Sequence, residues 1–481
     1  MNSTRMSATN VTRAVGAPGI SSGTEQAASL AYRSYVLVVL IIVYTFNFID
    51  RQIVGILAVP IKAELHLSDS QLGLVGGLAF ALFYTFLGIP IARLADRVNR
   101  IGIMTAALAL WSLMTAMCGL THNFAQLFLA RVGVGVGEAG GVAPAYSLIC
   151  DYFPTKERAR ALSVYSFGIP IGAAVGIVLG GYITSLMSWR MAFFIVGFAG
   201  LLITPLLKFT VREPKRGALD LQHVDADRAA EGDDAEGADA KGAAAADTAA
   251  KGTATRTAVR IDRVAAPSLL QVIAVLGRKP SFWGLSLGAA SASMMGYGLF
   301  FWAPSLLVRS FHLSLLQASL SFGSLVLVGG LIGIWCGGAL TDRYGEKRRA
   351  MYAFIPAIAF VATVPFYVAG VMSTTLWLSF AVLLVPTALG LVWLGPVLAA
   401  VQHLVPGTMR ATASALFLFI NNLIGIGLGT ALIGAVSDLM RHRFGAESLR
   451  YAILAGTGFY LVAAALLFFA GSKLAKDWVE S

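Results

Sequence analysis

The chain has 481 residues, of which 57% are hydrophobic and 13% are charged, and its mean hydropathy is +0.75. Soluble domains carry about 25% charged residues, so the composition excludes an ordinary soluble protein and indicates an all-α protein that crosses a membrane many times. The net charge of +11 does not call for nucleic acid, because cytoplasmic loops of membrane proteins are rich in lysine and arginine. The three cysteines lie in or beside apolar runs without metal-ligand spacing, so neither a metal nor a cofactor is expected.

In chain order, residues 1–33 lack an apolar run and are predicted to be a disordered cytoplasmic tail rather than a signal peptide. Residues 34–211 and 267–472 each contain six apolar segments long enough to be transmembrane helices. The twelve segments are 35–59, 71–93, 101–121, 124–149, 159–185, 190–209, 282–307, 315–340, 350–370, 375–402, 411–436 and 449–471. Residues 212–266, acidic and rich in alanine and glycine, are predicted to be a flexible linker, and residues 473–481 a cytoplasmic tail.

The loop charges predict the orientation. With the N-terminus inside, the short cytoplasmic loops would hold most of the loop lysines and arginines, among them Arg93, Arg97, Arg100, Arg158, Arg343, Lys347, Arg348, Arg349 and Arg410. This bias predicts that both termini are cytoplasmic, and we expect the inner membrane of a bacterium as the location.

The two halves repeat each other. The stretch Ala92-Arg-Leu-Ala-Asp96-Arg97 follows the second helix, and Gly338-Ala-Leu-Thr-Asp342-Arg343 follows the eighth. The pattern Pro-x-x-x-Arg-Ala-x-Ala also occurs twice, at an offset of 252 residues. Such a duplication predicts two pseudo-symmetric bundles that provide alternating access to a site between them.

Charged residues inside the apolar runs mark the candidate site. An arginine or acidic residue at a bilayer centre costs about 2.5–3.5 kcal/mol on insertion scales, so such residues usually face a protein interior or a water-filled path. Arg131 and Glu138 lie in the fourth helix, and Asp50 and Arg51 lie at a similar depth in the first. The nearby Gly135-x-Gly137-x-x-Gly140 matches a dinucleotide fingerprint, but no strand precedes it, so that interpretation is rejected. We expect a four-residue network lining a cavity. The alternative, an ion pair that only joins helices 1 and 4, is less favoured because buried ion pairs add little net stability.

The loop pattern Gly338-x-Leu-x-Asp342-Arg343-x-Gly345 resembles the signature of the major facilitator superfamily, although the first copy has Ala92 and Asn99 in place of glycines. Three further stretches resemble the Spinster-like branch: Asn47-Phe-Ile-Asp50-Arg51, Arg131…Gly137-Glu138-Ala139 and Ser166-Phe-Gly-Ile-Pro170. Organic-anion symporters of the superfamily share parts of the first two. The resemblance implies twelve transmembrane helices in two six-helix bundles, and proton-driven transport of lysophospholipid or sphingosine phosphate.

Glu138 is predicted to carry the coupled proton, with Asp50 as the second candidate, because every histidine falls in a loop, the linker or a helix end. At the 252-residue offset, Arg131 and Glu138 correspond to Leu383 and Gly390, so the second half lacks these charges. A cavity polar on one wall and aromatic on the other would suit an amphiphile with an anionic head. The predicted substrate-binding residues are Arg131, Arg51, Asn47, Asn421, Asn422 and Phe301.

The predicted gating residues are Asp96, Arg97, Asp151, Asp342 and Arg343. Asp96 and Asp342 are expected at the start of the following helix, where a carboxylate favours the helix dipole. The resemblance implies that Arg97 pairs with Asp151 at the inner end of helix 4. His403 occupies the matching position in the second half, so the equivalent latch for Arg343 is predicted to be missing or different.

Three classes of function compete. A monomeric secondary carrier for a small amphiphilic or anionic substrate is favoured. A membrane enzyme is disfavoured because the sequence contains no His-Glu-x-x-His motif or Ser-His-Asp arrangement. A non-transporting receptor or scaffold is the third class. Among carriers, a lipid or drug exporter competes with an organic-anion importer.

Overall fold

The computed structural model describes residues 29–95, 97–216, 268–345, 347–406 and 409–479, and these residues form helices and loops without strands. The predicted linker from residue 217 onward and residues 1–28 of the predicted N-terminal tail lie outside the described residues. The first helix, α1, begins at Leu30. The last helix, α19, continues to Asp477, and Leu474 within it is buried. The predicted C-terminal tail is therefore helical as far as Asp477.

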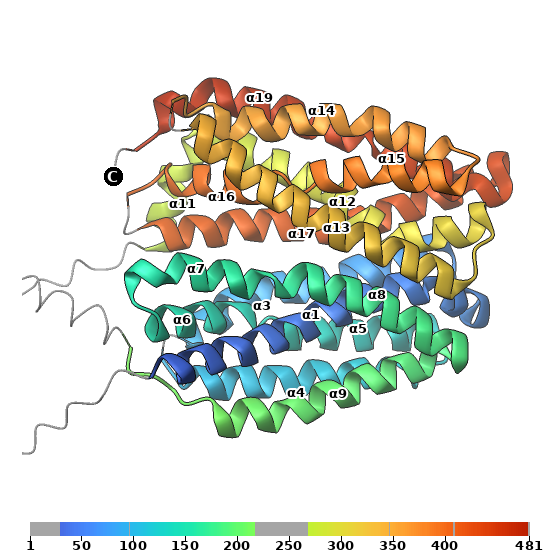
Figure 1. The fold of residues 1–481 in the computed structure, drawn as a ribbon, viewed down its shortest axis with the longest axis horizontal. Helices are drawn as coiled ribbons and strands as arrows, with labels where there is room; N and C mark the ends of the chain where they lie inside the picture. The colour runs from blue at the N-terminus through green and yellow to red at the C-terminus, as the bar shows by residue number, and fades with distance from the viewer. Residues whose placement is uncertain (1–28, 96, 217–267, 346, 407–408, 480–481) are drawn as a thin grey trace, which may run out of the picture.

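The helices of each half group into six membrane-crossing runs. Figure 1 shows how these helices are arranged. The N-terminal half consists of α1 (Leu30–Leu65), α2 (Asp69–Gly73) continued by the π-helix η1 (Leu74–Leu78) and α3 (Ala79–Ala95), α4 (Arg100–Cys118), α5 (Phe124–Glu138) with α6 (Val142–Tyr152), α7 (Thr155–Ser166) with α8 (Gly168–Leu186), and α9 (Trp189–Thr210). The C-terminal half consists of the short α11 (Leu269–Gly277), α12 (Pro280–Phe311), α13 (Leu315–Gly345), α14 (Met351–Met372), α15 (Leu376–Leu389) with α16 (Leu394–Gln402), α17 (Arg410–Phe444), the 3-10 turn η3 (Gly445–Glu447), and α18 (Ser448–Gly456) with α19 (Gly458–Asp477).

Length and hydropathy alone identify ten candidate membrane spans in the described residues. One of them, Thr412–Asp477, contains two crossings joined by η3. The run from Phe124 to Tyr152 is a further crossing, interrupted where α5 ends at Glu138 and α6 begins at Val142. The twelve predicted crossings are therefore all present.

Corresponding helices of the two halves end alike. The first membrane-crossing helix of each half, α1 or α12, ends at a histidine in the left-handed conformation, His66 or His312, each with φ 53°. Each histidine N–H donates back to a carbonyl of the last turn, Lys62 O or Leu307 O. Because non-glycine residues rarely adopt this conformation, the shared ending supports the duplication seen in the sequence.

Two glycines of α5 let it pack closely against its neighbours. A Cβ added at Gly135 would lie 2.5 Å from the carbonyl oxygen of Phe80 in α3, and one added at Gly137 would lie 2.6 Å from the backbone nitrogen of Trp111 in α4. Any larger residue would push these helices apart. The glycines between Arg131 and Glu138 therefore let this part of α5 lie directly against α3 and α4.

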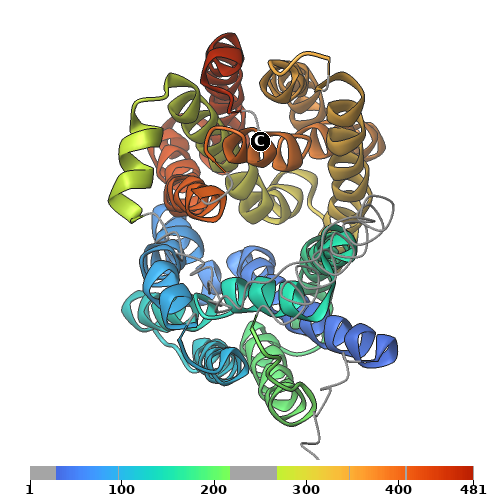
Figure 2. The same cartoon turned by 90° about the vertical axis from the view of Figure 1, so that its left-hand side faces the viewer.

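The two halves lie side by side, the N-terminal half in blue to green and the C-terminal half in yellow to red (Figures 1 and 2). They meet through α8 with α13, α1 with α12, and α17 with α2, η1 and α3. We call the end where α1 begins and α19 ends the termini end, and the opposite end, where α1, α12 and α17 finish, the far end.

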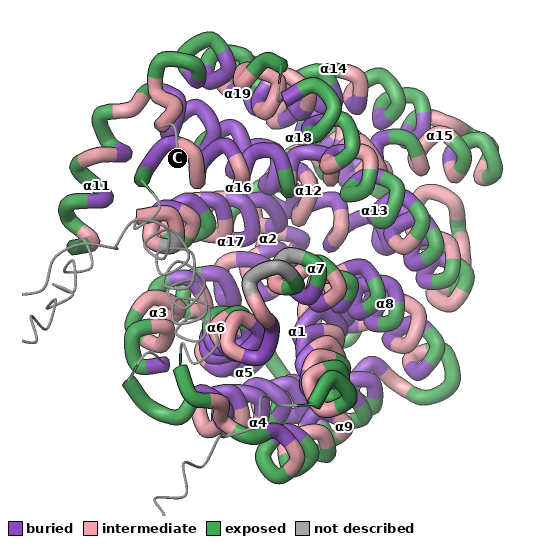
Figure 3. The backbone as a smooth tube through the Cα atoms, turned by 60° about the vertical axis from the view of Figure 1, so that its left-hand side comes forward, coloured by how far each residue is buried: buried purple, intermediate pink, exposed green. Residues whose placement is uncertain are grey.

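Large apolar side chains cover the outward faces of the helices. In Figure 3 the exposed stretches of the helices lie mainly on the outside of the molecule and the buried stretches mainly on the inside. Leu202, Trp335, Trp377 and Leu439 are among the most exposed, with 73–82% of their surface accessible. Apolar exposure on this scale is expected of a protein whose surroundings are lipid.

Candidate functional site

The centre of the site is an ion pair between α1 and α5. The Nε atom of Arg51 donates to Oε2 of Glu138 over 2.8 Å. The Glu138 side chain has no exposed surface, whereas 10% of the Arg51 side chain is exposed. The Arg51 guanidinium lies 5.0, 4.8 and 4.6 Å from the ring centroids of Phe48, Phe80 and Tyr84. Cation–π contacts with these three rings stabilise the position of the guanidinium.

Arg131 is buried near the ion pair but has unused donors. Only 1% of the residue is exposed, and its Nε and Nη1 atoms have no hydrogen-bond partner among the described residues. Asp50 is also buried, near Thr115, and is close enough to Arg131 and Glu138 to interact with both electrostatically. The predicted proximity of Asp50 to Arg131 is therefore present in the structure. Unpaired arginine donors in a buried site are suited to an anion.

A cavity connects these arginines to the C-terminal half. Its N-terminal wall consists of Arg51, Gln52, Gly76, Phe80 and Arg131, and its C-terminal wall of Tyr297, Phe300, Phe301, Ile426 and Thr430. Both charged residues lie on the first wall, and three aromatic rings lie on the second. Phe80 adds a ring to the first wall, so the walls differ in charge more than in aromatic content, and three of the six predicted substrate-binding residues line the cavity.

The remaining predicted binding residues lie elsewhere. Asn47 is buried beside Glu138. The side-chain oxygen of Asn421 accepts from Ser293 Oγ over 2.8 Å, and its Nδ2 donates to Asn422 Oδ1 over 3.4 Å. Neither asparagine of α17 lines the cavity in this structure, because Asn421 faces its own half.

The family model of the Major Facilitator Superfamily matches residues 40–430 of the chain. The chain belongs to the major facilitator superfamily. It is therefore a multi-pass integral membrane transporter. The predicted fold class, with two bundles of six helices, is confirmed.

Individual members of the superfamily place the chain more closely. It is 30% identical over 447 residues to an MFS-type efflux pump of Mycolicibacterium smegmatis, with 92% of this chain and 93% of that protein covered. It is 28% identical over 467 residues to protein spinster homolog 1 of Xenopus tropicalis, with 90% and 81% covered. The crystal structure of a bacterial homolog of the human lysosomal transporter Spinster, inward-facing and unoccupied, superposes with a TM-score of 0.78 at 31% identity over 94% of this chain and 99% of that one. The resemblance to the Spinster-like branch is confirmed.

The predicted pairing of Arg97 with Asp151 is wrong. Asp151 accepts from Arg100, over 2.5 Å, whereas Arg97 is exposed. The same Arg100 donates to Glu213 over 2.6 Å and to Ser147 over 2.7 Å, and only 1% of it is exposed. Because α4 begins at Arg100, this side chain points into the bundle, while Arg97 lies in the turn before the helix. The termini-end network of the N-terminal half therefore centres on Arg100.

The position of the second loop motif also differs from the prediction. Asp342 and Arg343 lie in the last turn of α13, which ends at Gly345, and both are exposed. The following helix begins only at Met351, so the carboxylate lies at the negative end of a dipole. Asp96 lies outside the described residues.

An aromatic cluster replaces the latch in the C-terminal half. The His403 ring stacks on Trp478 at 4.3 Å, and the Arg349 guanidinium lies 5.6 Å from the centroid of the Trp478 ring. His403 lies at the end of the fourth crossing of its half, as Asp151 does in the N-terminal half. Trp478 follows the sixth crossing, as Glu213 does, and Arg349 lies at the start of the third, as Arg100 does. Trp478 was not among the predicted site residues because it falls in the predicted cytoplasmic tail, residues 473–481.

Tyrosines near Arg51 form another group that the sequence analysis missed. Tyr44 in α1 stacks on Tyr165 in α7 at 4.3 Å, and Tyr146 in α6 meets Tyr165 edge-on at 5.6 Å. Tyr44, Tyr84 and Tyr165 are all close enough to Arg51 to interact with it electrostatically. Their positions inside apolar runs were the available signal, but each tyrosine alone is an ordinary membrane residue.

Proposed function

We propose that the chain is a proton-coupled secondary transporter that works by alternating access on an amphiphilic anion of the lysophospholipid or sphingosine phosphate type. The observation that carries the proposal is the buried Arg51–Glu138 pair beside the unused donors of Arg131, in a cavity shared by both halves. Buried ion pairs contribute little to stability, and charges within a membrane domain usually serve transport.

Coupling would follow from competition for Arg51. When Glu138 is ionised, it binds the guanidinium. When Glu138 takes up a proton, Arg51 becomes available to an anionic head group, which Arg131 also attracts. Proton binding and anion binding therefore favour each other. The proton and the anion are then transported in the same direction. Asp50, beside Arg131, is the second proton carrier we propose.

The substrate class follows from the two walls of the cavity. Arg51 and Arg131 would hold the anionic head, and Tyr297, Phe300 and Phe301 would contact the apolar part. Asn47 would bind the substrate near Glu138. Asn421 and Asn422 would line the site in another state of the cycle.

We also propose that the protein is a monomer in a bacterial inner membrane, with the termini end in the cytoplasm. The exposed basic residues Arg93, Arg97, Arg343 and Lys347 at this end support that orientation. Arg100 and Asp151, together with Asp96, Arg97, Asp342 and Arg343, would close this end in the outward-open state.

The test is transport into vesicles with an imposed pH gradient, measured for a lysophospholipid and for a small carboxylate in the same preparation. Lysophospholipid movement that depends on the gradient supports the proposal, whereas movement of the carboxylate alone favours an organic-anion symporter. A drug exporter is the second candidate, since one relative is named an efflux pump. Ligand binding without any flux would favour a receptor.

A further inference from the structure

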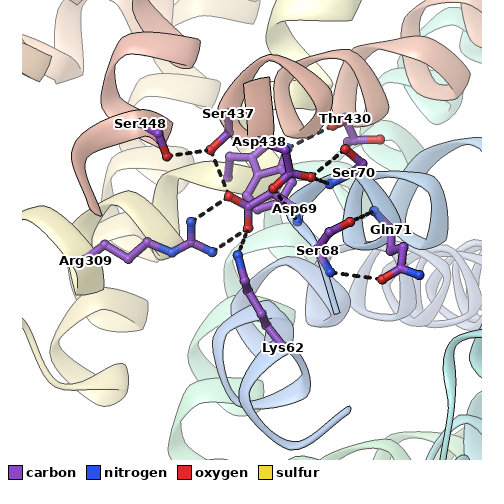
Figure 4. Close-up of polar contacts among 11 residues, drawn as sticks. Lys62, Ser68, Asp69, Ser70, Gln71, Arg309, Thr430, Ser437, Asp438 and Ser448 are labelled. Carbon is purple, nitrogen blue, oxygen red and sulfur yellow. Dashed lines mark hydrogen bonds and ion pairs between the residues drawn. The ribbon is translucent and has the colours of Figure 1, made fainter. Parts of the chain in front are cut away.

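At the far end, one buried carboxylate joins the two halves. Asp69, at the start of α2, is 2% exposed. Its carboxylate accepts from Lys62 over 2.5 Å, from Arg309 over 2.8 and 2.9 Å, and from Ser437 Oγ over 2.8 Å (Figure 4). Lys62 belongs to α1 in the same half, whereas Arg309 in α12 and Ser437 in α17 belong to the other half.

A second carboxylate makes the reverse connection. Asp438 of α17 accepts from the backbone N–H groups of Asp69 and Ser70, over 3.1 and 2.7 Å, and from Ser70 Oγ over 2.5 Å (Figure 4). These N–H groups belong to the first turn of α2, which has no intrahelical acceptor for them. The first turn of helix 2 is therefore capped by the opposite half of the protein.

Close to these carboxylates, the backbones of α2 and α17 approach each other. The Oγ1 atom of Thr430 in α17 donates to the Gly73 carbonyl over 2.9 Å. A Cβ added at Gly73 would lie 2.5 Å from the Thr430 carbonyl oxygen. Only a glycine at this position lets α2 and α17 come this close.

The charges are arranged so that separation of the halves breaks some contacts and preserves one. In the closed arrangement two cations, Lys62 and Arg309, balance two carboxylates, Asp69 and Asp438. When the halves separate, Arg309 and Ser437 move away from Asp69 and Asp438 leaves Ser70. Lys62 lies seven residues from Asp69 in the same half, so it remains as the counter-ion of Asp69.

We propose that Lys62, Asp69, Ser70, Arg309, Ser437 and Asp438 form the far-end gate of the transport cycle, and that Lys62 stabilises its open state. The inference rests on the alternating access of the proposed function. Asp69 favours the closed state because Arg309 and Ser437 reach it only there. Lys62 favours opening because it spares Asp69 from becoming an unpaired carboxylate, which would be costly. Substitutions of these two neighbours must therefore shift the equilibrium in opposite directions.

The experiment measures the far-end separation by electron-electron resonance between spin labels. Cysteines are introduced at the exposed positions His122 and Ala446, one in each half, after the three native cysteines are replaced by alanine. In Asp69→Asn, the population with a long label distance should rise by more than about tenfold over the unsubstituted protein. No increase in that population would overturn the proposal.

The effect of Lys62 is measured in a protein whose far end is already held open by another substitution. Gly73→Ala places a methyl group against Thr430 and should raise the long-distance population, whereas Gly88→Ala, which has nothing within 4 Å of its added Cβ, should not. Adding Lys62→Met to the Gly73→Ala protein should restore the short distance. A further rise on adding Lys62→Met would overturn the assignment of Lys62.

Two controls complete the experiment. Glu64→Gln removes a carboxylate at the same end that pairs with Arg190 within one half, and it should leave the distances unchanged. Asp438→Asn provides a second route to the open state if Asp69→Asn is not recovered as a folded protein. The label distances require no substrate, so a failed transport assay with shifted distances would refute the proposed function and leave the gate intact.

Discussion

Arg51 and Glu138 are 87 residues apart in the chain and form an ion pair of 2.8 Å within the N-terminal half. The carboxylate is wholly enclosed, while the arginine lines the cavity that the two halves share. An arginine in this position has two possible partners, the glutamate behind it and an anion in front of it. In the proposed function the pair acts as a switch, in which the charge state of Glu138 decides whether Arg51 is available.

Replacing Glu138 by glutamine tests that switch. Glutamine keeps the size of the side chain but cannot bind or release a proton, so substrate movement driven by a pH gradient should fall to the background of empty vesicles. Substrate exchange without a gradient should persist, because Arg51 and Arg131 remain. The measurement is uptake into proteoliposomes, with and without an imposed gradient.

The matched control for this substitution is Glu64→Gln. Glu64 also pairs with an arginine, Arg190, but 53% of its side chain is exposed at the far end. Gradient-driven uptake should be normal in this variant. Undiminished coupling in Glu138→Gln would show that the proton is carried elsewhere, with Asp50 as the next residue to replace.

The two cavity arginines should respond differently to replacement by methionine. Arg51→Met leaves the buried Glu138 carboxylate without its partner, which should destabilise the protein by about 3 kcal/mol. Arg131→Met removes a buried cation whose Nε and Nη1 have no hydrogen-bond partner among the described residues, so its melting temperature in detergent should fall less than that of Arg51→Met. Both variants should bind an anionic amphiphile at least about tenfold more weakly. Equal loss of stability in the two variants would contradict the proposed division between a paired and an unpaired arginine.

Arg100 and Arg97 provide a contrast at the termini end. Arg100→Ala removes the cation shared by Asp151 and Glu213, and the remaining carboxylates should repel each other, at a cost of about 3 kcal/mol. Arg97→Ala removes an exposed side chain and should change stability by less than about 0.5 kcal/mol. Melting temperatures of the two purified variants decide the matter, and the reverse order would restore Arg97 as the centre of the network.

The sequence predicted the central charges because intramembrane charges are few and helix geometry converts residue number into depth. Depth in the membrane places Arg131 near Asp50, and Arg51 and Glu138 both belong to the predicted four-residue network. The termini-end network was predicted less well. Whether Arg97 or Arg100 faces the bundle depends on where α4 begins, and a shift of three residues decides it.

The far-end cluster was beyond reach of the sequence for a different reason. The partners of Asp69 come from positions 240 and 368 residues later in the chain. Lys62 and Arg309 look like ordinary loop cations until the two halves are placed against each other. Pseudo-symmetry was of little help, since the C-terminal half uses different residue types at equivalent places, as His403 and Trp478 show.

His403 provides a prediction with a defined pH direction. Its ring stacks on Trp478, and burial, followed by the nearby charges of Arg410 and Arg349, lowers the pKa of His403 from its ordinary value of about 6.5. The folded protein therefore holds this histidine neutral, and the unfolded chain binds more protons as the pH falls below that value. The melting temperature should decline between about pH 7.5 and pH 5.5 more steeply in the unsubstituted protein than in His403→Gln. The comparison cancels the contribution of the other five histidines, which are present in both proteins. Parallel curves would mean that His403 titrates as freely as it does in the unfolded chain.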